Sequence, residues 1–353
     1  MGRLGFAVSI FFYTVVTIGS PAVLRRVTVA ELERDPYLSA GHEPFILEGA
    51  MESWGSMELF KDEGFFRREF PESIVDFYPR NLHKSEFKPY LVPMGGKDFA
   101  NGFFLPDEGA RGTGDDFYSQ SRYIHWRMHL SEFQEIKHLF EPLPNFMKVD
   151  ETWMEKCFPG KTRDEWPLDN FFRHAHWRII VIGQKNSSMF MHGDGFQTAT
   201  FVSQFVGRKR WIVCSPEYAR NLYRAGDIDM IHPETIDHVK FPLAKHADCS
   251  DSIVYPGEII YYPAHWWHQT FNLDTPTISM AGRRIDGHNF KEVSKELEGR
   301  CNSHQEDISK IWPGAAPILS KTVCQHIPHC SKIWQLLWDT PLSFMEAAND
   351  RFH

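Results

Sequence analysis

The chain reads Trp177-Arg178-Ile179-Ile180-Val181-Ile182-Gly183 at the middle of its 353 residues, a β-branched run that ends on glycine. Such a run predicts a β-strand, because branched side chains fit the pleated surface of a sheet. Further runs of this kind follow at residues 198–206, 209–214, 258–262 and 275–281. Short strands separated by Gly and Pro turns, without long helices alternating between them, predict an antiparallel barrel or sandwich.

Helical segments are expected on both sides of this β-rich region. Thr28 and Glu31 have the spacing of a capping box, which predicts a helix start, and the run at residues 45–49 predicts a strand after it.

The remaining segments are less regular. Residues 55–115 read as polar and irregular, and residues 95–116 as a long surface loop. Helical pieces interrupted near Pro142 are expected over residues 132–166, and the firmest helix after the strands is expected at residues 290–301.

The N-terminal segment is apolar. No charge occurs at residues 4–24, after the basic Arg3, and the small residues Ser20-Pro21-Ala22 end the run. This pattern predicts a secretory signal peptide over residues 1–22, which would bring the protein to the endoplasmic reticulum lumen. The segment is also long enough for an uncleaved membrane anchor. The third interpretation, a buried first element of the domain, leaves a cytoplasmic or nuclear location open.

Composition limits the possible partners. Aromatic residues make up 14% of the chain, with 11 Trp and 29 Phe, which is typical of a globular protein with a bulky core. The net charge is -8, and no long run of Lys or Arg occurs. Because nucleic-acid binding needs a basic surface, we expect no nucleic-acid partner, whereas a protein substrate remains open.

Six cysteines occur in the chain. Cys301, Cys324 and Cys330 are the best disulfide candidates, because they lie close together in the sequence. Cys214 ends an apolar run and is expected to be a free thiol in the core. No Cys-x2-Cys pair occurs, so a zinc finger is not expected.

The first candidate metal ligands are His192 and Asp194, separated by Gly193. On an extended chain, residues i and i+2 point to the same face, so the imidazole and the carboxylate would converge. A histidine from a distant strand would complete the 2-His-1-carboxylate set of non-haem Fe(II) sites, and His268 is the natural candidate.

His174 and His176 form a rival pair, since they would share one face if the chain is extended there. No carboxylate lies two residues from either histidine. The interpretation we favour is therefore a pair of structural histidines that are satisfied by hydrogen bonds at the entrance of a strand.

Four stretches in this order resemble the Jumonji C family, particularly its cupin-type hydroxylase branch. They are the strand and turn at 43–54, His192-Gly193-Asp194, Gly207-Arg208-Lys209-Arg210-Trp211, and the run from Tyr262-Pro263-Ala264-His265-Trp266-Trp267-His268 to Thr275. The resemblance covers residues 27 to about 290 and implies a double-stranded β-helix of the cupin or jelly-roll type.

The resemblance implies that His192, Asp194 and His268 hold Fe(II), while the cosubstrate 2-oxoglutarate chelates it through its keto and C1-carboxylate oxygens and O2 reacts there. Lys209 would pair with the far C5 carboxylate, and Tyr123 would help to hold that carboxylate. A lysine suits this role, because its compact cation sits on a long stem.

The sequence departs from the family pattern at three places. Met189 stands where the family usually has a threonine, and Ser188 beside it is the candidate to replace that hydroxyl. Val202 stands at the position of a common asparagine, and a second asparagine position falls at Gly282 or Arg283. These changes predict a less polar cosubstrate pocket, in which Arg283 would supply a charged contact of its own.

Residues around and beyond the last motif have other expected roles. Trp266 and Trp267 are expected to pack the barrel and orient His268, with the mouth of the substrate site as the alternative, and His265 is expected at the rim. The apolar C-terminal segment is expected to form helices, through which related hydroxylases often form homodimers.

The fold class that we predict is mainly β with helical flanks. The predicted divisions are the signal peptide or anchor at 1–22, an N-terminal extension packed on the barrel at 23–120, the catalytic core at 121–290 and a C-terminal helical segment at 291–353.

The function that the resemblance implies is hydroxylation of a side chain in a protein or peptide, with N-methyl demethylation less favoured. The first alternative is a metal-binding cupin without turnover that acts as a binding or scaffold protein. A zinc-dependent cupin isomerase is less favoured, because it gives Lys209 and the doubled Trp no role.

Overall fold

The computed structural model describes residues 22–62, 64–78, 89–96, 99, 122–147, 152–158, 168–302 and 321–338. The predicted signal peptide or anchor lies outside these ranges except for Ala22, as does most of the predicted loop at 95–116. Among the described helices, none is both long enough and apolar enough to cross a membrane.

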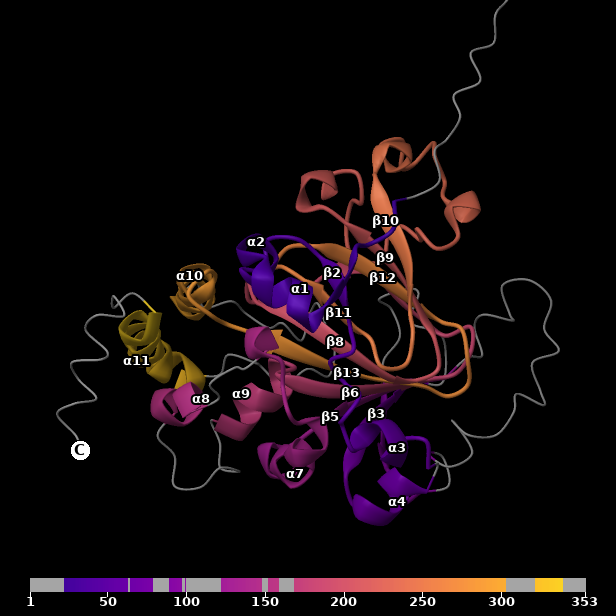
Figure 1. Ribbon diagram of the computed structural model, residues 1–353. Helices are drawn as coiled ribbons and strands as arrows, with labels where there is room; N and C mark the ends of the chain where they lie inside the picture. The colour runs from indigo at the N-terminus through magenta and orange to yellow at the C-terminus, as the bar shows by residue number, and fades with distance from the viewer. Residues whose placement is uncertain are drawn as a thin grey trace, which may run out of the picture.

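Two sheets form the centre of the molecule (Figure 1). In the part of the chain that the structure describes, the larger sheet has nine strands in the order β1-β2-β11-β8-β13-β6-β5-β3-β4, and only β1 and β2 pair in parallel. Its strands are β1 (Arg26–Thr28), β2 (Phe45–Glu48), β3 (Ile74–Tyr78), β4 (Tyr90–Pro93), β5 (Tyr123–Arg127), β6 (Arg178–Gly183), β8 (Ala199–Val206), β11 (Ile259–Tyr262) and β13 (Thr277–Arg284).

The smaller sheet is antiparallel and has the order β10-β9-β12-β7. Its strands are β7 (Ser188–Gly193), β9 (Lys209–Cys214), β10 (Cys249–Val254) and β12 (Trp267–Asn272). Two sheets of this kind, with helices at the flanks, agree with the predicted cupin or jelly-roll fold.

The interior between the sheets is apolar in its central part. Ile46, Val202 and Ile260 of the larger sheet join Trp211 and Val213 of the smaller sheet in one buried cluster. Because alternate residues of a strand face opposite sides, every second residue of these strands points into this interior.

Helices cover the opposite face of the larger sheet, where the largest hydrophobic cluster lies. In Figure 1, α3, α4 and α7 lie on the side of this sheet away from the smaller sheet. The described α-helices are α1 (Val29–Arg34), α2 (Pro36–Ser39), α3 (Ser56–Leu59), α4 (Phe65–Glu69), α7 (Leu130–Ile136), α8 (Thr152–Cys157), α9 (Leu168–His174), α10 (Phe290–Asn302) and α11 (Lys321–Trp338).

The described part of residues 55–115 is more ordered than the sequence suggested. It contains α3, α4, β3 and β4, and Phe60, Phe65 and Phe66 are buried in the large cluster. The prediction of an irregular segment was wrong, because these aromatic side chains fix short elements through tertiary packing that local propensity does not reveal.

The capping box at the first helix is confirmed. Thr28 Oγ1 accepts from the Glu31 backbone N–H, and the Glu31 carboxylate accepts from the Thr28 backbone N–H at 2.8 Å. The helix expected at residues 290–301 is also confirmed as α10.

Two disulfides join segments that lie apart in the sequence. Cys301 of α10 bonds to Cys324 of α11, as the sequence favoured. Cys214 bonds to Cys249, so the prediction of a free core thiol at Cys214 was wrong. The two residues face each other across the β9–β10 pair, a proximity that only the strand register creates.

Cys330 does not join a disulfide. Cys157 of α8 and Cys330 of α11 are both free and buried, and their thiols are in contact. Burial raises the pKa of the Cys330 thiol, so Cys330 is protonated at neutral pH.

Removal of the Cys214–Cys249 disulfide tests its contribution to stability. The bond spans a sequence separation of 35 residues. The double variant Cys214→Ala/Cys249→Ala is expected to lose about 3 to 4 kcal/mol of unfolding free energy, because the unfolded chain gains the entropy of an open loop. Urea unfolding under non-reducing conditions measures the loss, and coincident curves for the variant and the wild type would contradict it.

Candidate metal centre

Two neighbouring strands of the smaller sheet bring the three predicted metal ligands together. His192 lies on β7 opposite His268 of β12, and Asp194 follows the end of β7. The two imidazole rings are 4.2 Å apart between centroids. One ligand atom from each of the three side chains lies within 4.8 Å of the other two. This arrangement offers two imidazoles and one carboxylate to a single ion.

Backbone carbonyls orient both imidazoles in the same way. His192 Nδ1 lies 2.7 Å from the Phe190 carbonyl oxygen, and His268 Nδ1 lies 3.3 Å from that of Trp266. Because a carbonyl only accepts, each Nδ1 carries the proton and each Nε2 keeps its lone pair for a metal. Burial lowers the pKa of His192 and lowers that of His268 to about 3, so both rings are neutral at pH 7.

Three side chains of the larger sheet hold the Asp194 carboxylate. Arg283 of β13 forms a forked ion pair with it, with Nη1 2.5 Å from Oδ2 and Nη2 3.1 Å from Oδ1. Thr200 and Tyr262 donate their hydroxyls to Oδ2 at 2.8 and 3.0 Å. Burial alone would raise the pKa of the Asp194 carboxyl, but Arg283, His268 and His192 hold it well below its ordinary value. The carboxylate is therefore ionised before any metal binds.

The donor set fits a divalent metal ion. Two neutral imidazoles and one carboxylate on one side of an ion leave its other positions open, as in non-haem Fe(II) sites. A carboxylate has about four lone-pair directions, so Asp194 can serve a metal while it accepts from Arg283. The guanidinium nevertheless competes for the same anion, since it contacts both oxygens.

Lys209 lies at a second polar site in the interior. Its side chain is 3% exposed, its Nζ donates to the Tyr123 hydroxyl at 3.0 Å, and it lies over the rings of Tyr123 and Trp211. Burial lowers the pKa of Lys209 to about 7. Within the described ranges, no acidic side chain contacts this amine. A buried lysine without an acidic partner is a candidate binding position for an anion, because a bound anion would stabilise its charged form.

A family model described as a cupin-like domain matches residues 31–281. The chain belongs to the cupin-like domain family. The match covers more than half of the chain, and the relatives named below agree with the predicted Jumonji C type.

Three curated relatives illustrate the similarity of this cupin-like protein to known ones. The arginine-specific demethylase JMJ20 of Arabidopsis thaliana is 29% identical over 186 residues, which are 47% of this chain and 40% of that protein. The mouse 2-oxoglutarate and iron-dependent oxygenase JMJD4 is 24% identical over 145 residues, 40% of this chain and 34% of that protein. Human HSPB1-associated protein 1 is 26% identical over 168 residues, 45% of this chain and 30% of that protein. The chain thus spans 40% or less of the length of each of these relatives.

Other predicted residues of this cupin-like domain lie as follows. Met189 faces the interior, where it packs against the cluster of Tyr78, Tyr123 and Val181. Ser188 pairs with Phe271, which packs on the outer cluster of the smaller sheet, so Ser188 lies on the face away from Lys209. The register therefore does not support Ser188 as the replacement hydroxyl.

The structure of β13 shows whether Gly282 or Arg283 faces the interior at the second asparagine position of the family pattern. A Cβ at Gly282 would lie 2.3 Å from the Phe201 ring, so this position needs glycine on the helix-covered face. Arg283, the next residue, consequently points into the interior toward Asp194.

The aromatic residues before His268 divide between the two faces of the smaller sheet. Trp266 packs against the interior cluster, and its carbonyl orients His268. Trp267 packs against the outer cluster, and His265 is exposed in the turn. Both tryptophans therefore pack the fold, which was the favoured interpretation.

Two further histidines lie near this centre. Burial, with help from Arg127, lowers the pKa of His125 and of His176 well below the ordinary value. His125 also feels the charge of Lys209, and His176 that of Arg283. Nothing in the sequence selected His125 in advance, because a lone histidine on a short strand carries no motif.

The rival pair differs from the expectation in its backbone. His174 ends α9, and His176 lies in the following turn with a φ of 53°, so the chain there is not extended. The two residues therefore do not share a strand face, and the side chain of His174 lies outside what the structure describes.

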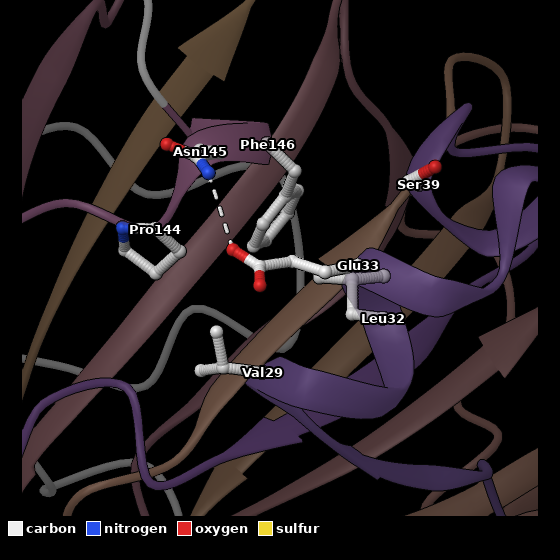
Figure 2. A pocket seen from close by; sticks show the side chains of 7 residues that line it. All are labelled: Val29, Leu32, Glu33, Ser39, Pro144, Asn145 and Phe146. Atoms are coloured by element: carbon white, nitrogen blue, oxygen red, sulfur yellow. Dashed lines mark hydrogen bonds between the residues drawn. The ribbon is translucent and has the colours of Figure 1, made fainter.

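A separate pocket lies between α1, α2 and the 3-10 turn at Asn145–Met147, as Figure 2 shows. Asn145 donates to Glu33 across it at 3.1 Å. Phe146 packs on Tyr261, whose neighbour Tyr262 points to Asp194 from the opposite face of β11. The pocket is therefore on the other side of the larger sheet from the metal ligands.

The unpaired charge of Lys209 should make stability depend on pH. The folded pKa is about 7 and the ordinary value is 10.5, so between these values the unfolded chain holds a proton that the folded chain lacks. Stability of the ligand-free protein should therefore rise with pH across this window, by about 1 kcal/mol per pH unit relative to Lys209→Met. Urea unfolding of both proteins from pH 7 to 9 measures the difference, and parallel pH profiles would count against an unpaired Lys209.

Replacement of Arg283 tests its competition with a metal. Arg283→Met should destabilise the metal-free protein by about 3 to 5 kcal/mol, because Asp194 is left as an uncompensated buried charge. The affinity for Mn(II) should rise by about tenfold or more, since the ion then supplies the missing positive charge.

Arg208→Met is the matched control for Arg283→Met, because Arg208 makes a forked pair with Asp274 at the surface. Surface pairs contribute little, so both stability and metal affinity should stay near wild type. Calorimetric titration with Mn(II) gives the affinities, and weaker binding by Arg283→Met would contradict the competition.

Proposed function

We propose that this protein is an Fe(II)- and 2-oxoglutarate-dependent oxygenase that acts on a side chain of a protein or peptide. The observation that carries the proposal is Lys209, a buried ammonium without an acidic partner in the described ranges, in the same interior as a 2-His-1-carboxylate set. A cosubstrate with a carboxylate at its far end satisfies both features at once.

Each side chain has a distinct task in this proposal. His192, Asp194 and His268 would hold the iron, and Lys209 with Tyr123 would hold the C5 carboxylate of 2-oxoglutarate. Bound iron would supply the oxidative chemistry, in which 2-oxoglutarate and O2 give succinate, CO2 and one oxygen atom for a C–H bond of the substrate. The fixed Nδ1 protons and the donors on Asp194 keep the three ligands in place, so little reorganisation is needed on binding.

The apolar interior supports the same proposal. Trp211 and Tyr262 pack against each other and against His268, and both belong to the same buried cluster as Val202, so this interior should exclude water. Exclusion of water strengthens the attraction between Lys209 and an incoming carboxylate, because the local dielectric constant is low.

Hydroxylation is the outcome we favour for the substrate. Relatives are named both as a 2-oxoglutarate and iron-dependent oxygenase and as an arginine-specific demethylase. Demethylation is the same oxidation directed at an N-methyl group, so the identity of the substrate side chain separates the two. The relative named HSPB1-associated protein 1 favours a protein as the partner.

We further propose that the protein works in the secretory pathway. The apolar N-terminal run and the two described disulfides favour an oxidising compartment. Homodimer formation through α10 and α11 stays a prediction, which the mass in solution would test.

A second candidate function is a metal-binding cupin without turnover that serves as a binding protein. The forked pair between Arg283 and Asp194 favours it, since Asp194 has a cationic partner without metal. Met189 and Val202 also remove two polar groups that the family pattern places near the cosubstrate.

Succinate formation distinguishes the two candidates. Purified protein with Fe(II), ascorbate, O2 and 2-oxoglutarate should release succinate, and Lys209→Met should release at least about tenfold less while it still binds Mn(II), because it loses a charge-assisted contact. Succinate is measured by mass spectrometry. If wild-type protein with metal bound releases no more succinate than His192→Ala, the binding-protein function replaces the oxygenase.

A further inference from the structure

The cosubstrate site lacks one hydroxyl where the family pattern has a threonine. Met189 of β7 occupies that position, and its thioether packs on the cluster of Tyr78, Tyr123 and Val181. A thioether cannot donate a hydrogen bond, so this side chain cannot contribute to binding of a carboxylate in the way a hydroxyl does.

Thr270 is the direct cross-strand partner of Met189. It lies on β12, two residues after His268, and pairs with Met189 of β7 on one side and with Trp211 of β9 on the other. Directly paired residues of an antiparallel ladder point to the same face, so Thr270 points into the interior with Met189. Two residues further along β12, Asn272 pairs with Lys209 of β9, and this pair faces the interior as well.

The Thr270 hydroxyl is buried and lacks a well-formed hydrogen bond. Thr270 is 3% exposed, and its Oγ1 forms no hydrogen bond of good geometry with any described residue. It nevertheless lies close enough to the Tyr123 hydroxyl to lower the pKa of that group slightly, against the larger rise that burial causes. Tyr123 in turn accepts from Lys209 Nζ at 3.0 Å. Three polar groups from β5, β9 and β12 thus gather at one point of the interior.

We propose that Thr270 donates its hydroxyl to the C5 carboxylate of 2-oxoglutarate, beside Lys209 and Tyr123, and so replaces the hydroxyl that Met189 lacks. The inference rests on the proposed function and names a residue of its cosubstrate site. A valine has nearly the same shape and would pack on Trp211 without leaving a buried polar group unsatisfied, so the hydroxyl is unfavourable at this position unless a ligand uses it.

The test compares Thr270→Val with wild type in Mn(II)-loaded full-length protein without O2, by calorimetric titration with 2-oxoglutarate. Thr270→Val should lose about tenfold or more in affinity for 2-oxoglutarate, because a hydrogen bond to a charged group disappears. Its affinity for Mn(II), and for pyruvate, a 2-oxo acid without the far carboxylate, should stay within about twofold of wild type, since neither contacts Thr270.

Two further variants separate a binding role from a structural one. Thr270→Ser keeps the hydroxyl and should keep 2-oxoglutarate affinity within about threefold of wild type. This expectation can be tested even if Thr270→Val folds poorly. Thr270→Val/Met189→Thr moves the hydroxyl to the paired residue on β7 and should recover most of the lost affinity, because both positions face the same point.

The outcomes bear separately on the two proposals. If Mn(II)-loaded wild type does not bind 2-oxoglutarate, the proposed function fails and this inference fails with it. If wild type binds and Thr270→Val binds equally well, or loses pyruvate and metal affinity in the same proportion, the role of Thr270 is overturned while the proposed function stands. A Thr270→Ser variant that binds no better than Thr270→Val would also overturn it.

Discussion

A buried ion pair between Asp194 and Arg283 is the interaction on which the centre of this molecule depends. Asp194 follows β7 of the smaller sheet, and Arg283 belongs to β13 of the larger sheet, so the pair spans the interior between them. An isolated carboxylate in that position would be costly, because little water reaches it. The guanidinium neutralises the charge and fixes both oxygens with its planar fork. The Asp194 carboxylate therefore stays beside His192 and His268 without a metal ion to hold it.

The contact between Lys209 and Tyr123 also joins the two sheets, but it pairs a titratable amine with a neutral hydroxyl. Lys209 of β9 donates to the hydroxyl of Tyr123 on β5 and lies over the rings of Tyr123 and Trp211, but it lacks a negative partner in the described ranges. Among the described residues, the Asp194 charge is thus balanced by Arg283, whereas Lys209 has no acidic partner. For this reason the triad is compatible with both candidate functions, whereas the buried Lys209 is the feature on which the proposal of an anionic cosubstrate rests.

The surrounding structure keeps these side chains in register. β12 lies between β7 and β9, so a single strand orients His268 toward His192 and Thr270 toward Met189. Cys214–Cys249 ties β9 to β10 at the base of the insertion between them. On the other side, Trp153 of α8 stacks edge-on against Trp177, just before β6, and against Trp334 of α11. The C-terminal helix therefore supports the larger sheet behind the strands that carry Arg283 and Tyr123.

The sequence by itself determined the local features. β-branched runs located β6, β8, β9, β11 and β13, the capping box located α1, and the spacing of His192 and Asp194 with the family motifs selected the triad. These features depend on side-chain periodicity and propensity over a few residues, which the sequence displays directly. Only the tertiary structure decided that Arg283 rather than Gly282 faces Asp194, that Ser188 faces outward while Thr270 faces Lys209 and Tyr123, and that Cys214 meets Cys249. Each of these depends on where a strand ends and which residue lies opposite, and a shift of one residue in register would reverse every facing direction.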